Sequence, residues 1–139
     1  MTDGIELAVE ELGRELAAHG YEKTGGHGSK GFGDEVTCYS FMNVSVRVVR
    51  DRGQWFFEAS PTNGADWFDA DLWHACLTNE PAPVEPRSAS IQAHLLTNEL
   101  ADLTETAQTS PMVTLERLRA LRRARSRRRI GIDTGESGS

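Results

Sequence analysis

Carboxylates and aromatic residues stand close together in the middle of this 139-residue chain. Asp66, Asp69 and Asp71 are interleaved with Trp67 and Phe68. A carboxyl group beside aromatic rings can have a raised pKa, which is how the acid groups of glycosidases arise. Asp69 and Asp71 also stand where a following helix would begin, and aspartate is favoured at the positive end of a helix dipole. We therefore interpret Asp69 and Asp71 as candidate helix caps rather than as catalytic acids.

The chain offers few residues for metal binding or nucleophilic catalysis. His74 and Cys76 are two residues apart on an expected helix, so their side chains point about 200° away from each other. The sequence has no Cys-x-x-Cys pair, no His-x-x-x-His pair and no local signature of a cysteine–histidine nucleophile. We therefore expect no metal, no cofactor and no enzymatic activity. The residues weighed for these roles are Cys38, Cys76, His19, His27, His74 and His94.

Five glycines fall within residues 24–33, where a phosphate-binding loop is one conceivable function. The order Ser29-Lys30-Gly31 differs from the Gly-Lys-Ser/Thr of a P-loop, and no apolar strand precedes it. Glycine also loses more conformational freedom on folding than any other residue. We therefore predict that residues 24–33 form a flexible connector.

The net charge of -6 conceals two segments of opposite sign. Residues 1–116 contain 19 acidic and 7 basic residues, whereas residues 117–129 contain 8 arginines and no acidic residue. An acidic surface attracts basic proteins, and an arginine-rich segment attracts nucleic acid or another anionic surface. Ordinary solvated surface is the alternative interpretation of both segments.

The arginine-rich segment supports an alternative function, that of a nucleic-acid-associated accessory or regulatory protein. Several arginines can neutralise phosphates, and binding would then depend strongly on salt. However, the acidic remainder of the chain would repel the same polyanion, and the sequence has no helix-turn-helix, zinc-finger or RNA-recognition signature. The candidate residues for this alternative are Arg122, Arg123, Arg125, Arg127, Arg128 and Arg129.

Alternating residues predict a β-hairpin at the centre of the chain. Residues 43–50 alternate between valine and polar side chains, and residues 54–59 alternate in a similar way. Residues 51–53 between them predict a three-residue loop in which Gly53 adopts a positive φ. Because residues 36–41 are also rich in strand-forming types, we expect an antiparallel meander of three or more strands.

Four segments have the apolar spacing or the capping residues of helices. The first covers residues 4–18, a short one ends near Leu77, and the third covers residues 88–105. The last begins at residues 110–111, and its apolar residues end at Leu121. The predicted fold class is therefore α+β, with an N-terminal helix, the meander, and then three helices of which the last is rich in arginine.

Length and composition predict one domain. We assign residues 1–121 to this α+β domain, and residues 122–139 to an arginine-rich helix end that projects into solvent and a flexible tail. No apolar run reaches the roughly 18 residues of a membrane span, and the first residues have no signal-peptide character. Two cysteines fit a reducing compartment. We therefore expect a cytoplasmic protein with no membrane partner.

The tryptophans are the best candidates for a contact surface. All three fall within residues 55–73, where most of the aromatic side chains are expected to build the core. Trp67 follows a glycine-containing loop and is flanked by aspartates, so we single it out as an exposed anchor. An aromatic anchor ringed by carboxylates suits a basic protein partner. The candidate partner-binding residues are Trp67, Asp66, Asp69, Asp71 and Glu58.

The central hairpin and the residues that follow it resemble known bacterial proteins. Residues 46–58, followed by 67–69 and 72–73, are similar to small proteins of high-GC bacteria, some of which are grouped with immunity proteins of polymorphic toxin systems. The resemblance covers about 35 residues and includes no catalytic motif. It implies a cytoplasmic, non-enzymatic α+β protein that binds and neutralises one toxin. The leading hypothesis is therefore an immunity-type module for a basic toxin.

Overall fold

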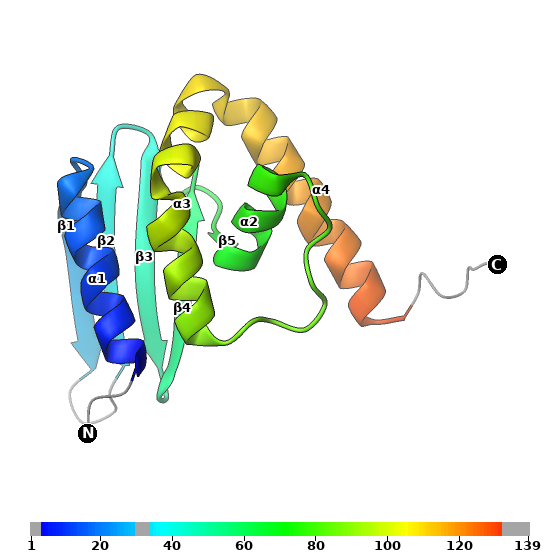
Figure 1. Ribbon diagram of the computed structural model, residues 1–139. Coiled ribbons are helices and arrows are strands. Elements are labelled where there is room, and N and C mark those ends of the chain that lie inside the picture. The colour runs from blue at the N-terminus through cyan, green and yellow to red at the C-terminus, as the bar shows by residue number, and fades with distance from the viewer. Residues whose placement is uncertain (1–3, 30–33, 132–139) are drawn as a thin grey trace.

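The computed structural model describes residues 4–29 and 34–131 of the chain. These residues form a five-stranded antiparallel sheet in the order β1-β2-β3-β4-β5, and four helices. The helices α1 and α3 cover one face of the sheet, whereas α4 packs on α2 and α3 beside it (Figure 1). The predicted α+β arrangement, with one helix before the meander and three after it, is confirmed. The elements are α1 (Gly4–Ala18), β1 (Glu22–Ser29), β2 (Asp34–Phe41), β3 (Val44–Asp51), β4 (Gln54–Ser60), β5 (Phe68–Asp69), α2 (Ala70–Thr78), α3 (Ala89–Thr109) and α4 (Pro111–Arg129).

The glycine-rich segment is largely a strand, so the prediction of a flexible connector is wrong for β1. This strand contains three of the five glycines and pairs with β2 along its length, with one shift in register between Lys23 and Gly25. Residues 30–33, the remainder of the predicted connector, lie outside the described residues. The prediction weighed the entropic cost of glycine but not the backbone hydrogen bonds that an edge strand gains from its neighbour.

The β3–β4 hairpin has the predicted alternation. Val46 pairs with Ala59 and Val48 pairs with Phe57, and all four side chains are buried. Successive residues of a strand point to opposite faces of the sheet. The even-numbered valines of β3 therefore face the helices, and the residues between them face the other side.

The turn of this hairpin has two residues instead of the predicted three. Asp51 pairs with Gln54, which leaves Arg52 and Gly53 in the loop. Their φ values are 54° and 82°, so the predicted positive φ of Gly53 is confirmed and Arg52 shares it. Two positive φ values are typical of a type I′ turn, whose twist matches the twist of the flanking strands.

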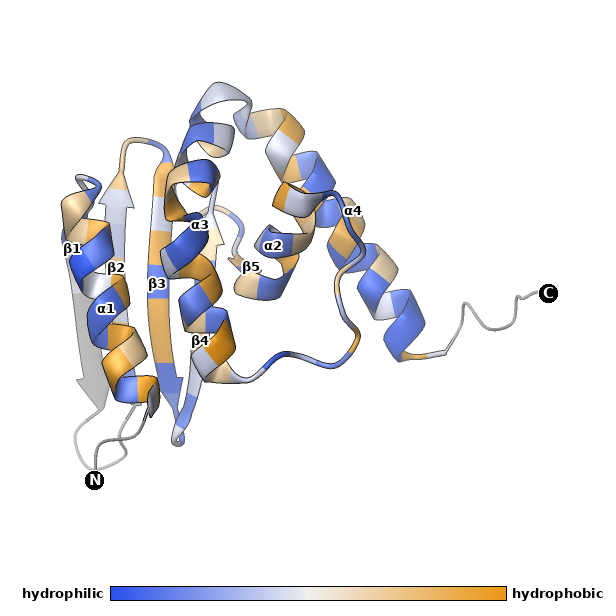
Figure 2. Ribbon diagram, viewed as in Figure 1, coloured by the Kyte–Doolittle hydropathy of each residue, from blue (hydrophilic) through white to orange (hydrophobic). Residues whose placement is uncertain are grey.

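The core lies between the sheet and the helices (Figure 2). Leu12 and Leu16 of α1, Phe57 of β4 and Trp73 of α2 are fully buried. The indole N–H of Trp73 donates to the carbonyl of Ala59 at 2.9 Å, which satisfies the one polar group of that side chain. The helix α2 is thereby fixed to β4.

The helices α2 and α3 begin at side-chain caps. Asp69 accepts a hydrogen bond from the backbone N–H of Leu72 at 2.9 Å, so the predicted cap at this position is confirmed. Asp71 lies inside the first turn of α2 and is not the cap. Ser88 accepts from the backbone N–H of Ile91 at the start of α3.

The helix α4 packs against the rest of the chain beyond its last apolar residue. Leu115 and Leu118 are buried, whereas Met112, in the first turn of this helix, is 60% exposed. The helix continues past Leu121 to Arg129, and Arg125 is only 9% exposed. The expectation that this end projects into solvent is therefore wrong for Arg125, because its guanidinium is directed toward carboxylate oxygens of the body.

Candidate interaction surfaces

Asp66 binds two arginines of α4. Its carboxylate accepts hydrogen bonds from Arg119 at 3.1 Å and from Arg122 at 3.0 and 3.1 Å. The hydrogen bond from Arg122 is the main reason that the pKa of Asp66 lies below its ordinary value; partial burial opposes this shift and Arg119 adds to it. The guanidinium of Arg122 also lies 4.5 Å from the ring centre of Phe68. Asp66 therefore holds α4 in place.

Asp69 and Asp71 have arginine partners as well. The two carboxylate oxygens of Asp69 lie 3.2 and 2.9 Å from nitrogens of Arg125. Asp71 is 1% exposed, and it accepts from both the side chain and the backbone N–H of Arg87, at 2.7 and 3.1 Å. The prediction that Asp71 contacts a partner is therefore wrong, because its carboxylate is inaccessible in the folded chain.

Trp67 and Glu58 share one arginine. The guanidinium of Arg47 lies 4.2 Å from the ring centre of Trp67 and donates to Glu58 at 2.6 Å. Arg47 and Glu58 are cross-strand neighbours whose side chains point away from the helices. Trp67 and Glu58 are both partly exposed. The arginine neutralises the carboxylate and covers part of the indole.

The surface around Trp67 is consequently not acidic. Each of the four carboxylates predicted to surround this residue has an arginine partner, and the arginines outnumber them. Because these carboxylates are neutralised by arginines, they do not create the negative potential that would attract a basic protein. The arginines concerned are Arg47, Arg87, Arg119, Arg122 and Arg125.

The arginine-rich segment is largely engaged inside the chain. Besides the contacts with Asp66 and Asp69, Arg128 donates to the carbonyl of Ala82, and Arg129 donates to the carbonyl of Val84 at 3.2 Å. Carbonyl and carboxylate oxygens thus occupy part of the donors that a nucleic-acid phosphate would need, and the carboxylates neutralise Arg122 and Arg125. The engaged members of the predicted nucleic-acid set are Arg122, Arg125, Arg128 and Arg129.

Cys76 and His74 have structural surroundings. Within residues 4–29 and 34–131, no three or more His, Cys, Asp or Glu side chains converge as metal ligands would. Burial raises the pKa of the Cys76 thiol, and nearby Arg117 offsets part of this effect, so the reactive thiolate is disfavoured. His74 lies 2.5 Å from Glu99 and thereby joins α2 to α3.

Exposed carboxylates gather instead on the outer sides of α1 and α3. Glu11 lies 3.9 Å from His94, so the outward sides of these two helices adjoin. Leu7, one turn before Glu11, is 57% exposed, and Ile91, one turn before His94, is 50% exposed. We call the outward sides of α1 and α3, with these two residues and the carboxylates on them, the α1/α3 surface. Its exposed carboxylates are Glu6, Glu10, Glu11, Asp102 and Glu105, and Glu15 is partly exposed.

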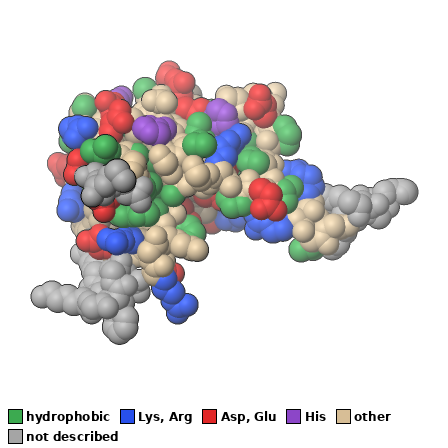
Figure 3. All heavy atoms as spheres, turned by 60° about the horizontal axis from the view of Figure 1, so that its bottom comes forward, with side chains coloured by type: hydrophobic (Ala, Val, Ile, Leu, Met, Phe, Trp, Pro, Cys, Tyr) green, Lys and Arg blue, Asp and Glu red, His purple; other side chains and the backbone are tan. Residues whose placement is uncertain are grey.

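Figure 3 turns the lower end of the molecule toward the viewer, and acidic, histidine and apolar side chains intermingle along its upper part. Lys and Arg side chains gather on the right of the same view, toward α4. The α1/α3 surface was not predicted from the sequence, because the candidates for a contact surface were chosen among the aromatic residues. The available signal was Leu7, which interrupts the acidic side of the first helix, away from its buried stripe.

The sheet also has an apolar row on the face that points away from the helices. Val36, Val49 and Phe56 are cross-strand neighbours on β2, β3 and β4. Phe56 is 43% exposed and the two valines are partly exposed. Their row lies next to the row of Arg47 and Glu58. Three exposed apolar side chains are ordinary for a protein surface, and no charge pattern accompanies them.

Comparisons with known proteins do not add to these observations. No family model, curated protein or solved structure matches the chain. In the part of the chain that the structure describes, no helix has both the length and the apolar composition needed to cross a membrane. The surfaces of the molecule are therefore the basis for its proposed function.

Proposed function

We propose that this protein is a cytoplasmic protein-binding module of the immunity type, which binds and neutralises a basic toxin domain through the α1/α3 surface. One observation carries the proposal: two exposed apolar side chains, Leu7 and Ile91, lie on the outward sides of adjoining helices that also carry exposed carboxylates. Apolar side chains that lose water at the centre of an interface supply binding energy, whereas charges at the rim speed association and select the partner.

The distribution of the basic residues supports the same function. The helix α1 contains one basic residue, Arg14, and α3 contains no lysine or arginine. Arg122, Arg125 and Arg128 of α4 are directed toward carboxylates and carbonyls near α2 and β5. The α1/α3 surface thus keeps an excess of negative charge that a basic partner can neutralise.

The alternative function in nucleic-acid binding has less support. A polyanion would have to displace the carboxylates of Asp66 and Asp69 from Arg122 and Arg125. It would also approach a chain whose first 116 residues carry 19 acidic and 7 basic residues. Both requirements oppose binding of a polyanion, so the charges favour a basic protein as the partner.

The test begins with capture of partners from the source organism by the tagged full-length chain, with a matched pair of double variants. Glu10→Gln with Glu11→Gln removes two charges from the α1/α3 surface, whereas Glu80→Gln with Glu116→Gln removes two from exposed sites elsewhere. We expect one basic protein to bind the wild type and the second variant. Its association rate should fall about tenfold in the first variant at low salt.

The captured protein is then expressed alone and together with the chain. We expect growth arrest by the partner alone and relief when the chain is present. Capture of no basic protein, or of a basic protein that does not arrest growth, contradicts the proposal. Equal binding by both double variants, with loss in Val49→Ser, contradicts the α1/α3 surface and points to the outer face of the sheet.

A further inference from the structure

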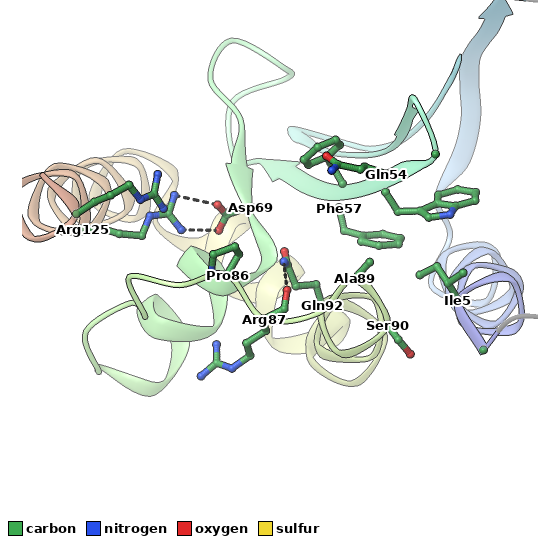
Figure 4. Close-up of a pocket in the computed structure, with 15 residues that line it drawn as sticks. Ile5, Gln54, Phe57, Asp69, Pro86, Arg87, Ala89, Ser90, Gln92 and Arg125 are labelled. Atoms are coloured by element: carbon green, nitrogen blue, oxygen red, sulfur yellow. Dashed lines mark hydrogen bonds and ion pairs between the residues drawn. The ribbon is translucent and has the colours of Figure 1, made fainter. Parts of the chain in front are cut away.

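A groove of about 640 Å³ lies where α1 and α3 begin and α4 ends (Figure 4). Its volume is within the range of sites for small molecules. The walls come from five parts of the chain: the start of α1, the β3–β4 turn with β4, Asp69 of β5, the segment before and at the start of α3, and the last turns of α4. The groove is distinct from the outward side of α1 and α3.

One end of the groove is apolar. Ile5, Phe57 and Ala89 lie together there, on the side of Figure 4 opposite to Arg125. Trp55 also lines the groove, and its ring stacks on that of Phe57 with a centroid distance of 6.4 Å. Apolar groups that line a concave site favour a ligand with a hydrocarbon or aromatic body, because both surfaces lose water on contact.

The other end is basic. Arg87, Arg125 and Arg129 line the groove, and Asp69 is its one acidic residue among the described residues. Asp69 is neutralised by Arg125, which approaches it with two nitrogens (Figure 4). A guanidinium has five N–H donors, and the hydrogen bond of Arg129 to Val84 uses one of them. Donors therefore remain for an anionic group beside the apolar end.

The geometry points to a binding site for a small amphipathic anion, an apolar chain that carries one carboxylate. The hydrocarbon lies along Ile5, Trp55, Phe57 and Ala89, and the carboxylate accepts hydrogen bonds from Arg129 at the basic end. Charge complementarity selects an anion over a cation or an alcohol of the same chain length. Arg87 is neutralised by Asp71 and Arg125 by Asp69, whereas Arg129 donates to an uncharged carbonyl and keeps its positive charge.

Decanoate is the probe, measured by isothermal titration calorimetry on the full-length chain. We expect one molecule of decanoate to bind per chain, with decanol at least about tenfold weaker and decyltrimethylammonium and acetate weaker still. Arg129→Gln should weaken decanoate binding about tenfold, because it removes the charge-assisted hydrogen bonds. The matched control is Arg123→Gln, an exposed arginine of the same helix that does not line the groove.

A second variant tests the apolar end. Ala89→Phe fills the groove and should abolish decanoate binding, and circular dichroism checks that this variant still folds. Arg129 is exposed, so Arg129→Gln keeps the test decisive if Ala89→Phe does not fold. Binding of decyltrimethylammonium equal to that of decanoate, or equal losses in Arg129→Gln and Arg123→Gln, overturns the proposal. So does unchanged binding in a folded Ala89→Phe.

Discussion

Asp71 is the most deeply buried carboxylate among the described residues, and its partner decides its energetic role. It is 1% exposed, whereas the side chain of Arg87 is 34% exposed and can still reach water. A buried charge without a partner is costly, so the pair depends on both members being present. The contact joins the first turn of α2 to the segment before α3. Asp71 therefore stabilises the packing of two helices.

We predict that Asp71→Ala lowers the free energy of unfolding by about 2–3 kcal/mol, since it leaves the guanidinium of Arg87 without its carboxylate partner. Water reaches part of this guanidinium, which limits the loss. Chemical denaturation measures the loss. Glu116→Ala is the control, because the side chain of Glu116 is 67% exposed and its contact with Arg119 is long at 3.9 Å. Equal stability of Asp71→Ala and the wild type would show that Asp71 is not buried in this pair.

At the scale of elements, the attachment of α4 depends on pH through Asp66. Its pKa in the folded chain lies below the ordinary value because Arg122 and Arg119 favour the charged form. The unfolded chain thus takes up a proton before the folded chain does. The stabilisation is complete above the ordinary carboxyl pKa of 3.8 and is lost as the pH falls through the lowered value.

We predict that the melting temperature of the wild type falls as the pH is lowered through this range, and that Asp66→Asn flattens this part of the profile. The side-chain amide that this substitution introduces has no charge to lose on acidification, so its contacts with α4 do not change. Circular dichroism melts between pH 6 and about 2.5 measure both profiles. A profile for Asp66→Asn as steep as that of Glu116→Gln would contradict the role assigned to Asp66.

At the scale of the whole molecule, the arginine-rich end of α4 offsets part of the negative net charge of the rest of the chain. Residues 1–121 alone contain 19 acidic and 9 basic residues, which is a net charge of -10. Arg122 forms an ion pair with Asp66 in the β4–β5 loop, and Arg125 forms one with Asp69 just before α2. Self-repulsion of like charges destabilises a compact chain, so this segment contributes to the stability of the body.

We predict that a chain truncated after Leu121 is less stable than the full-length chain by about 2–4 kcal/mol, because carboxylates lose their partners and the net charge grows. Added salt should recover part of the loss, since it screens the repulsion. Thermal melts of both chains at low and high salt measure the effect. Equal melting temperatures would show that residues 122–139 are independent of residues 1–121.

Local patterns predicted most of the elements. Alternation with period two located the β3–β4 hairpin, and the type and position of Asp69 made it, together with Asp71, a candidate helix cap. Each of these depends on neighbours a few residues away. The strand β1 was not predictable in this way, because it is stabilised by β2 and not by the propensities of its own glycines.

The sequence by itself determined the α+β class, the aromatic core around Phe57 and Trp73, and the segregation of acidic and basic residues along the chain. The tertiary structure alone decided which charges cancel. Asp66 and Arg122 are 56 residues apart in the chain and 3.0 Å apart in space. Coulomb attraction depends on that distance and on burial, neither of which the order of residues specifies. For this reason the carboxylates around Trp67 are neutralised, while those of α1 and α3 keep their charge at the surface.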